Sequence, residues 1–217
     1  MTERAIHQGQ PVATYGAALS GADAAVILLH GRGSSAQSIL ALAAQLPQGR
    51  IAYLAPQAAN HTWWPNSGFI PLLSNEPYVS SAFQAVADLL ARVAAAGVPA
   101  ERILLGGFSQ GACLAAEFAA RNPRRYGGLF VLSGALLGPP DMPRHYAGSL
   151  EGTPVFIAGC DRDPWVTERQ LRLTGRLLQE LGGSVGLAIQ PGSEHTIRPP
   201  EVMAVSDMIA RAAGSGA

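Results

Sequence analysis

The segment Gly107-Phe108-Ser109-Gln110-Gly111 has the residue types and spacing of a reactive serine. An apolar run over residues 102–106 precedes it, and a stretch dense in good helix formers follows over residues 112–120. In a strand, sharp turn and helix of this kind, the turn exposes the serine hydroxyl at the carboxyl edge of a sheet. The two outer glycines allow strand and helix to pass closely, and the helix N-terminus favours an oxyanion beside the serine. The pattern predicts a nucleophile for acyl transfer.

The serine needs a general base, because its hydroxyl is a poor nucleophile at neutral pH, and the base needs an orienting partner. Of the five histidines, only His195 follows the serine, ends an expected strand and precedes an expected helix, so we predict that it is the base. The other four are expected in solvated segments (His7, His145), at a strand end (His30) and in an irregular segment (His61).

The orienting acid has three candidates after the serine. Asp163 follows an expected strand in a turn fixed by Pro164, and Asp161 lies two residues earlier. Asp141 follows the preceding strand, although aspartate favours turns in any case. Spacing favours the 161/163 pair over Asp141 and does not separate the two members of the pair.

An oxyanion hole requires two N–H donors aimed at the developing negative charge. One should be the backbone N–H of Gln110, directly after the serine. The other should come from the loop after the expected strand at 24–29, where Gly31 and Gly33 permit close approach of the backbone to a substrate. We therefore predict the backbone N–H of Arg32 as the second donor.

Strands must alternate with helices to carry these residues. The apolar runs predict strands over residues 24–29, 51–56, 102–106, 128–134, 154–159 and 185–189, with a further edge strand over 11–16. Helices are expected after residue 35, from Ser81, from Thr167 and over 200–213. This alternation predicts one α/β domain over residues 1–217 with a mainly parallel sheet flanked by helices, and with poor order at 1–10 and 214–217.

The least regular segment runs over residues 57–79 and contains three prolines that argue against a long helix or a central strand. A loop of this length in a compact domain is usually functional or disordered, and its aromatic content favours order. We predict that its apolar side chains wall the acyl site beside the serine: Trp63, Trp64, Phe69, Ile70, Leu72 and Leu73.

The composition excludes several other classes of protein. Fifteen basic and fifteen acidic side chains cancel, and no basic patch indicates nucleic acid. Cys113 and Cys160 make neither a disulfide framework nor a metal-ligand cluster, so no cofactor or metal is expected. No signal core or membrane span is present, which predicts a cytoplasmic protein without stable membrane association. The sequence leaves a homodimer open.

Five motifs in order give the chain a wider resemblance: Leu29-His30-Gly31-Arg32-Gly33, Thr62-Trp63-Trp64-Pro65, the serine segment, Asp163-Pro164-Trp165-Val166 and Pro191-Gly192-Ser193-Glu194-His195-Thr196. Together they resemble the phospholipase/carboxylesterase family of α/β-hydrolases, which includes the acyl-protein thioesterases. The resemblance implies an α/β-hydrolase fold without a separate cap domain, and hydrolysis of carboxylic esters or thioesters without a cofactor.

Carried over by position, the resemblance makes Ser109 the nucleophile, His195 the base and Asp163 the acid, with Arg32 and Gln110 as the oxyanion amides. The chain departs from the family at Thr167, where a proline is usual. An extra residue before Asp163 also keeps Asp161 as a rival.

The first hypothesis is therefore a serine carboxylesterase acting on short- to medium-chain esters through an acyl-enzyme. The first alternative is an acyl thioesterase or lysophospholipase with the same machinery and a small ester or thioester substrate. A different class is a ligand-binding module on this fold without hydrolysis, since a fold does not dictate function. An active-serine probe separates the classes, because a module without a competent nucleophile would not be labelled.

Overall fold

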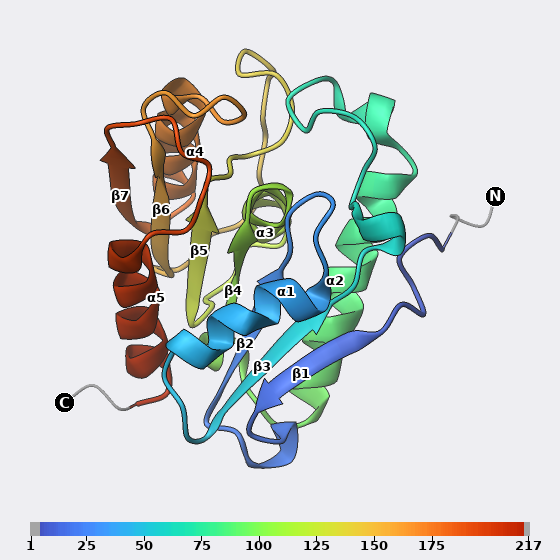
Figure 1. Cartoon of the computed structure of the whole chain (residues 1–217), viewed down its shortest axis with the longest axis vertical. Helices are drawn as coiled ribbons and strands as arrows, with labels where there is room; N and C mark the ends of the chain where they lie inside the picture. Colours follow the sequence, from blue (N-terminus) through green and yellow to red (C-terminus); the bar gives the residue numbers. More distant parts are fainter. Residues whose placement is uncertain (1–4, 215–217) are drawn as a thin grey trace.

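The computed structural model describes residues 5–214 of the chain, and in this part seven strands form a single sheet (Figure 1). Their order in the sheet is β1-β3-β2-β4-β5-β6-β7. Only β1 runs antiparallel to its neighbour, β3, and all other neighbouring pairs are parallel. The strands are β1 (Val12–Gly16), β2 (Ala24–Leu29), β3 (Ile51–Pro56), β4 (Ile103–Phe108), β5 (Gly128–Leu132), β6 (Pro154–Cys160) and β7 (Ser184–Gln190).

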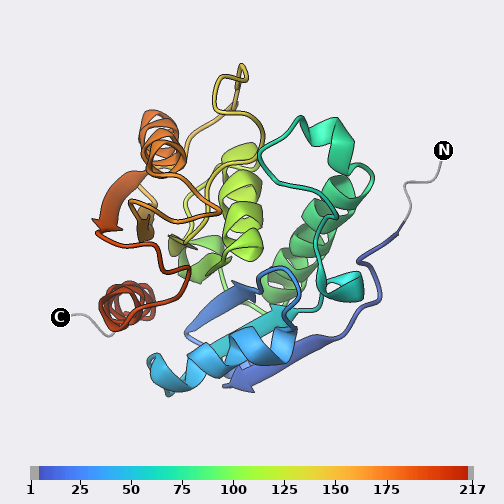
Figure 2. The ribbon, with the colours of Figure 1, turned by 45° about the horizontal axis from the view of Figure 1, so that its top comes forward.

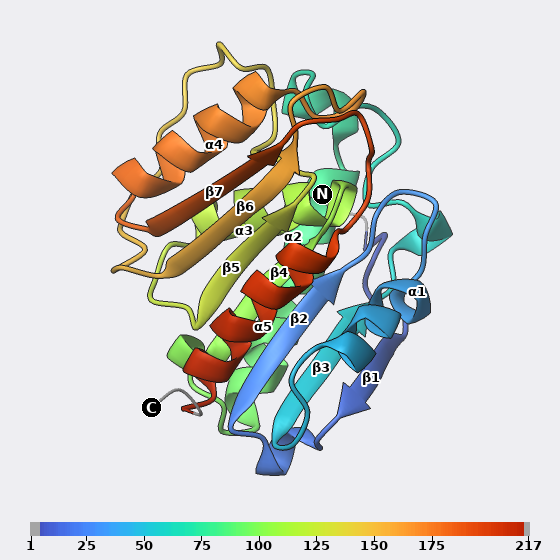
Figure 3. The ribbon, with the colours of Figure 1, turned by 60° about the vertical axis from the view of Figure 1, so that its left-hand side comes forward.

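Helices cover both faces of this sheet (Figure 3). One apolar cluster packs α2, α3 and α4 against one face, and a second packs α1 and α5 against the other. Within the described residues, no helix has the length and apolar character needed to cross a membrane. The helices are α1 (Ala36–Leu40), α2 (Tyr78–Ala95), α3 (Gln110–Arg121), α4 (Glu168–Glu180) and α5 (Pro199–Ala212), with short 3-10 turns at Leu19–Gly21, Ala41–Gln45, Ala59–His61, Leu72–Asn75 and Ala100–Arg102.

The sheet interior explains the apolar runs of the sequence. Every residue of β2, β3 and β5 is buried, because helices cover both faces of these strands. The expected mainly parallel sheet flanked by helices is confirmed, and no separate cap domain is present among the described residues.

The carboxyl ends of the parallel strands gather the predicted motifs at one edge of the sheet. Figure 2, which brings this edge forward, shows α3 between the segment before α2 and the loops that follow β5, β6 and β7. The serine segment follows β4, and the segments containing Asp163 and His195 follow β6 and β7. Residues far apart in the sequence therefore lie in one place.

Two expectations about helices are wrong in detail. The helix after residue 35 keeps α-geometry only over α1 and continues as a 3-10 turn, Ala41–Gln45. Ser81 does not begin a helix; it lies inside α2, and its hydroxyl accepts hydrogen bonds from the backbone N–H groups of Ile6 and His7. The Ser81 side chain, which the capping pattern predicts at the start of a helix, therefore makes a tertiary contact instead. The capping box at Thr167 is confirmed.

The same contact involves the N-terminal segment, which was expected to be poorly ordered. Residues 5–10 are joined to α2 through Ser81, and the His7 side chain is only 3% exposed. Residues 1–4 and 215–217, also in the ranges expected to be poorly ordered, lie outside the described part of the chain.

Candidate active site

The turn at Ser109 holds the serine in an unusual backbone conformation. Its φ of 56° and ψ of −121° place a non-glycine residue in a region that L-residues rarely adopt. A Cβ atom added at Gly107 would lie 2.3 Å from the carbonyl oxygen of Leu29, and one added at Gly111 would lie 2.1 Å from it. The two glycines are therefore required by space, and they let α3 begin directly against β2.

Ser109, His195 and Asp163 form a continuous chain of hydrogen bonds. The Nδ1 atom of His195 lies 2.7 Å from Oδ2 of Asp163, and its Nε2 atom lies 2.8 Å from Oγ of Ser109. Because an ionised carboxylate only accepts, Nδ1–H donates to Asp163, which leaves Nε2 free to accept from the serine hydroxyl. This arrangement suits the abstraction of the serine proton.

The carboxylate of Asp163 is buried and fixed from two sides. Its Oδ1 atom accepts from the backbone N–H groups of Trp165 (2.8 Å) and Val166 (3.1 Å), and its Oδ2 atom faces His195. Asp161, its rival in the sequence, instead accepts from the backbone N–H of Gly192. Asp141 pairs with Arg169 at the surface. The structure therefore brings only Asp163, of the three candidates, to His195.

The remaining histidines lie outside this chain of hydrogen bonds. His30 is fully buried, and its Nε2 accepts from the backbone N–H of Ala58. Burial lowers the pKa of both His7 and His30, so both are neutral structural groups. The expectation that His7 is solvated is wrong, because it is buried beside Trp63. His61 and His145 are exposed.

The backbone N–H groups of Arg32 and Gln110 have no hydrogen-bond acceptor among the described residues. Their side chains hold the segment Thr62–Asn66. The Gln110 amide accepts from the backbone N–H of Trp63 (2.9 Å) and donates to the carbonyl oxygen of Trp64 (2.9 Å). The Arg32 guanidinium donates to the carbonyl oxygens of Pro65 and Asn66. This second role leaves no signal in the sequence, because only the tertiary fold brings these side chains to that segment.

The residues predicted to wall the acyl site differ in burial: some lie in the core and others at the surface. Trp63 and Trp64 are 0% and 1% exposed, and the indole N–H of Trp63 donates to the carbonyl oxygen of His30. Both side chains therefore lie within the core and not on an exposed wall. Phe69 and Leu72 are half-buried, and Leu73 is 85% exposed.

Trp64→Ala should act on stability rather than on acyl preference. Removing a fully buried indole leaves a cavity, and we expect a loss of about 3–5 kcal/mol in the free energy of unfolding. Denaturant unfolding measures this loss, and an acyl chain-length series on the folded variant should keep the wild-type profile. An unchanged stability with an altered profile would return Trp64 to the substrate wall.

A buried carboxylate in α3 joins the loop after β5 to the helix that carries the serine. Glu117 is fully buried, and its Oε2 atom accepts from the backbone N–H of Leu137 and the hydroxyl of Tyr146, both at 3.1 Å. Its Oε1 atom accepts from Arg121 at 2.7 Å. The loop after β5 also meets the segment before α2, since the N–H of Gly138 donates to the carbonyl oxygen of Gly68. The two loops therefore form one connected edge.

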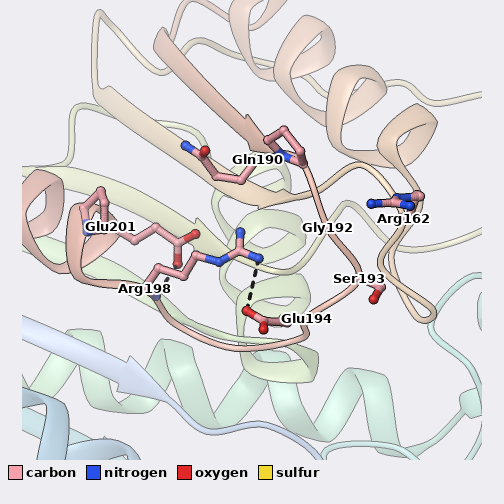
Figure 4. Close-up of a pocket in the computed structure, with 9 residues that line it drawn as sticks. Arg162, Gln190, Gly192, Ser193, Glu194, Arg198 and Glu201 are labelled. Carbon is pink, nitrogen blue, oxygen red and sulfur yellow. Dashed lines mark hydrogen bonds and ion pairs between the residues drawn. The ribbon is translucent and has the colours of Figure 1, made fainter.

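A cavity of about 440 Å³ lies behind the loop that carries His195 (Figure 4). The Arg198 side chain points along this loop and faces Glu194, with Nη2 3.6 Å from Oε2. Glu201 is buried on the other side of Arg198, and burial raises the pKa of its carboxyl. This cavity does not include Ser109, and neither does a second one, of about 670 Å³, beside α4.

Comparison with known proteins relates this geometry to one family. The Phospholipase/Carboxylesterase family matches residues 17–213. A crystal structure of a phospholipase/carboxylesterase from Dyadobacter fermentans is 36% identical, covers 93% of this chain and 96% of that chain, and superposes with a TM-score of 0.88. The Bacillus cereus carboxylesterase, at 17% identity with coverage of 94% and 95% and a TM-score of 0.74, shares the α/β-hydrolase fold.

Curated relatives match over shorter stretches. Acyl-protein thioesterase 1 of Neurospora crassa is 30% identical over 128 residues, or 56% of this chain and 51% of that protein. The Saccharomyces cerevisiae protein of the same name is 40% identical over 70 residues, or 32% and 31%. The matched region thus spans about half of these relatives or less. From the match over residues 17–213, the chain belongs to the Phospholipase/Carboxylesterase family.

Proposed function

We propose that this protein hydrolyses short- to medium-chain carboxylic esters through an acyl-enzyme formed on Ser109. The hydrogen-bonded chain from Ser109 through His195 to Asp163 carries this proposal. Ser109 Oγ attacks the carbonyl carbon of the ester while its proton passes to Nε2 of His195. Asp163 keeps the imidazole in the required tautomer and stabilises the imidazolium that forms.

The oxyanion of the tetrahedral intermediate is bound by the backbone N–H groups of Arg32 and Gln110. Neither N–H has a partner among the described residues, so both can donate to substrate without breaking an existing bond. The C–O bond to the leaving alcohol then breaks, and His195 gives its proton to that alcohol. A water molecule, deprotonated by His195, attacks the acyl-enzyme and releases the acid and the free serine.

The preference for short to medium acyl chains rests on the apolar residues at the carboxyl edge. Leu73 is highly exposed in the segment before α2, and Trp165, directly after the turn of the acid, is 70% exposed. Phe69 and Leu72 lie half-buried in the same segment as Leu73. Exposed apolar surface of this kind is stabilised when an acyl chain covers it.

The proposal is tested with a chain-length series of p-nitrophenyl esters. We expect kcat/KM to rise with acyl length over short chains, by up to about fourfold per methylene, and then to fall. Leu73→Ala should flatten the rise and leave the acetyl ester nearly unaffected. The matched control is Met203→Ala, which removes an exposed apolar side chain from α5. A flat wild-type profile, or equal losses on all esters in Leu73→Ala, would remove the segment from the acyl site.

Thioester hydrolysis is the second candidate function, because the curated relatives are named acyl-protein thioesterase 1. The same attack and proton transfers apply when the leaving group is a thiol. Matched pairs of esters and acyl thioesters with the same acyl chain decide between the two. A higher kcat/KM on the thioester at every chain length would make thioester hydrolysis the main activity.

A further inference from the structure

The strands that precede Asp163 and His195 remain joined beyond their ends. β6 and β7 pair in parallel as far as Cys160 and Gln190, and the N–H of Asp161 still donates to the carbonyl oxygen of Gln190 (3.0 Å). In a continued parallel ladder, the N–H of Gly192 would next donate to the backbone carbonyl of Asp161. It donates instead to the side chain of Asp161, with 2.8 Å to Oδ1.

We call residues 160–163 the acid loop and residues 191–196 the histidine loop. The hydrogen bond in which the Asp161 side chain takes the place of a backbone carbonyl joins these two loops. Two further bonds cross between them: the N–H of Arg162 donates to the carbonyl oxygen of Gly192 (3.0 Å), and Sγ–H of Cys160 donates to that of Glu194 (3.0 Å). The Asp161 carboxylate is the only carboxylate in the described part that joins the histidine loop to the acid loop besides Asp163 itself.

Gly192 is suited to receive this contact. Its φ of 135° is a conformation that side chains disfavour, and the loop turns there toward His195. The carboxylate of Asp161 reaches further than its backbone carbonyl, so the two chains can diverge at this turn and still be joined. His195 follows three residues later, and its distances to Asp163 and Ser109 depend on where the turn places the loop.

The contact between Asp161 and Gly192 depends on the hydrogen bond more than on the charge of the carboxylate. Nε of Arg162 lies 3.6 Å from the same Oδ1 atom of Asp161, and both side chains are partly exposed, so their ion pair contributes little. A neutral acceptor in the same place could therefore serve as well. This separates the role of Asp161 from that of Asp163, which must stabilise an imidazolium.

We propose that Asp161 is a positioning residue that fixes the histidine loop to the acid loop and so holds His195 between Asp163 and Ser109. The inference rests on the proposed function, because it assumes that His195 acts on Ser109. Asp161 touches neither the substrate nor the reacting atoms and acts through the backbone of Gly192.

The test compares three variants of the full chain on p-nitrophenyl acetate. Asp161→Ala removes the acceptor and should lower kcat by about 10- to 100-fold with KM within about twofold, the size expected when a catalytic group is displaced. Asp161→Asn keeps an acceptor oxygen and should remain within about threefold of wild type, since the bond is retained without the charge. Arg162→Ala, the matched control, removes the neighbouring charge and should leave kcat nearly unchanged. Thermal unfolding is measured for each, and rates are compared below the lowest midpoint.

A second measurement reports the position of His195 without relying on turnover. The proton NMR signal of the Nδ1–H group of His195 should shift or broaden in Asp161→Ala and stay in place in Asp161→Asn and Arg162→Ala. Wild-type kcat in Asp161→Ala would overturn the proposal, and so would equal losses in the Ala and Asn variants. A wild-type enzyme without activity would instead contradict the proposed function, while the NMR comparison would still decide whether Asp161 positions His195.

Discussion

Ser109→Ala and His195→Ala are each expected to reduce ester hydrolysis by about 10⁴-fold or more. The reason is the hydrogen bond of 2.8 Å between Nε2 of His195 and Oγ of Ser109. Without the hydroxyl no acyl-enzyme forms, and without the imidazole the hydroxyl keeps its proton. Initial rates on p-nitrophenyl acetate, with purified protein of verified fold, measure the effect.

The control for this prediction is His145→Ala, which removes an exposed histidine from the loop after β5 and should keep wild-type kcat. Because the three residues act as a unit, the double variant of Ser109 and His195 should be no slower than either single variant. If either single variant kept a tenth of the wild-type kcat, its proposed role would be wrong.

Asp163→Asn is expected to cost about 10⁴-fold in kcat at neutral pH. An asparagine can still accept from the N–H groups of Trp165 and Val166, so the turn should keep its shape. Its amide cannot stabilise an imidazolium, and where its NH₂ group faces Nδ1 it favours the opposite tautomer of His195. The serine hydroxyl then loses its acceptor.

The matched control for this prediction is Asp161→Asn, made two residues away with the same change of chemistry. Its hydrogen bond to Gly192 survives in the amide form, and its loss of rate should be small. Comparable losses in the two asparagine variants, or a larger loss at position 161, would transfer the role of the acid to Asp161. kcat and KM are measured separately, since both predicted effects lie in kcat.

The sheet could be predicted from the sequence because parallel strands covered on both faces read as continuous apolar runs. β2 and β3 have the predicted ends, and the remaining strands differ by one or two residues. The details of helices were harder to predict. Ser81 has the spacing of a cap, yet its hydroxyl binds the N-terminal segment, a contact between residues about 75 positions apart. Local patterns carry no information about such partners.

The candidate site shows the same division. Ser109, Asp163 and His195 could be proposed from the sequence because few residue types can supply a nucleophile, an acid and a base in that order at strand ends, and the structure places the three within hydrogen-bond distance of one another. The burial of Trp63 and Trp64 in the core could not be predicted, because apolar character signals only removal from water, and a core and a substrate pocket both provide it. The Gln110 side chain gave no signal, since a glutamine that binds a distant backbone resembles any surface glutamine.

The attachment of the Thr62–Asn66 segment has a consequence for redesign. The amides that would bind the oxyanion belong to Arg32 and Gln110, and the side chains of these two residues grip that segment. The proposed acyl wall, residues 69–73, follows this segment in the chain, so under the proposed function acyl preference and oxyanion binding are linked through residues 62–66. A graft that replaces this segment with that of a relative should also preserve the hydrogen bonds from the side chains of Arg32 and Gln110. A graft that loses these hydrogen bonds would displace the two backbone amides. It would then lower the rate of hydrolysis even for the smallest substrate, which does not contact the new segment.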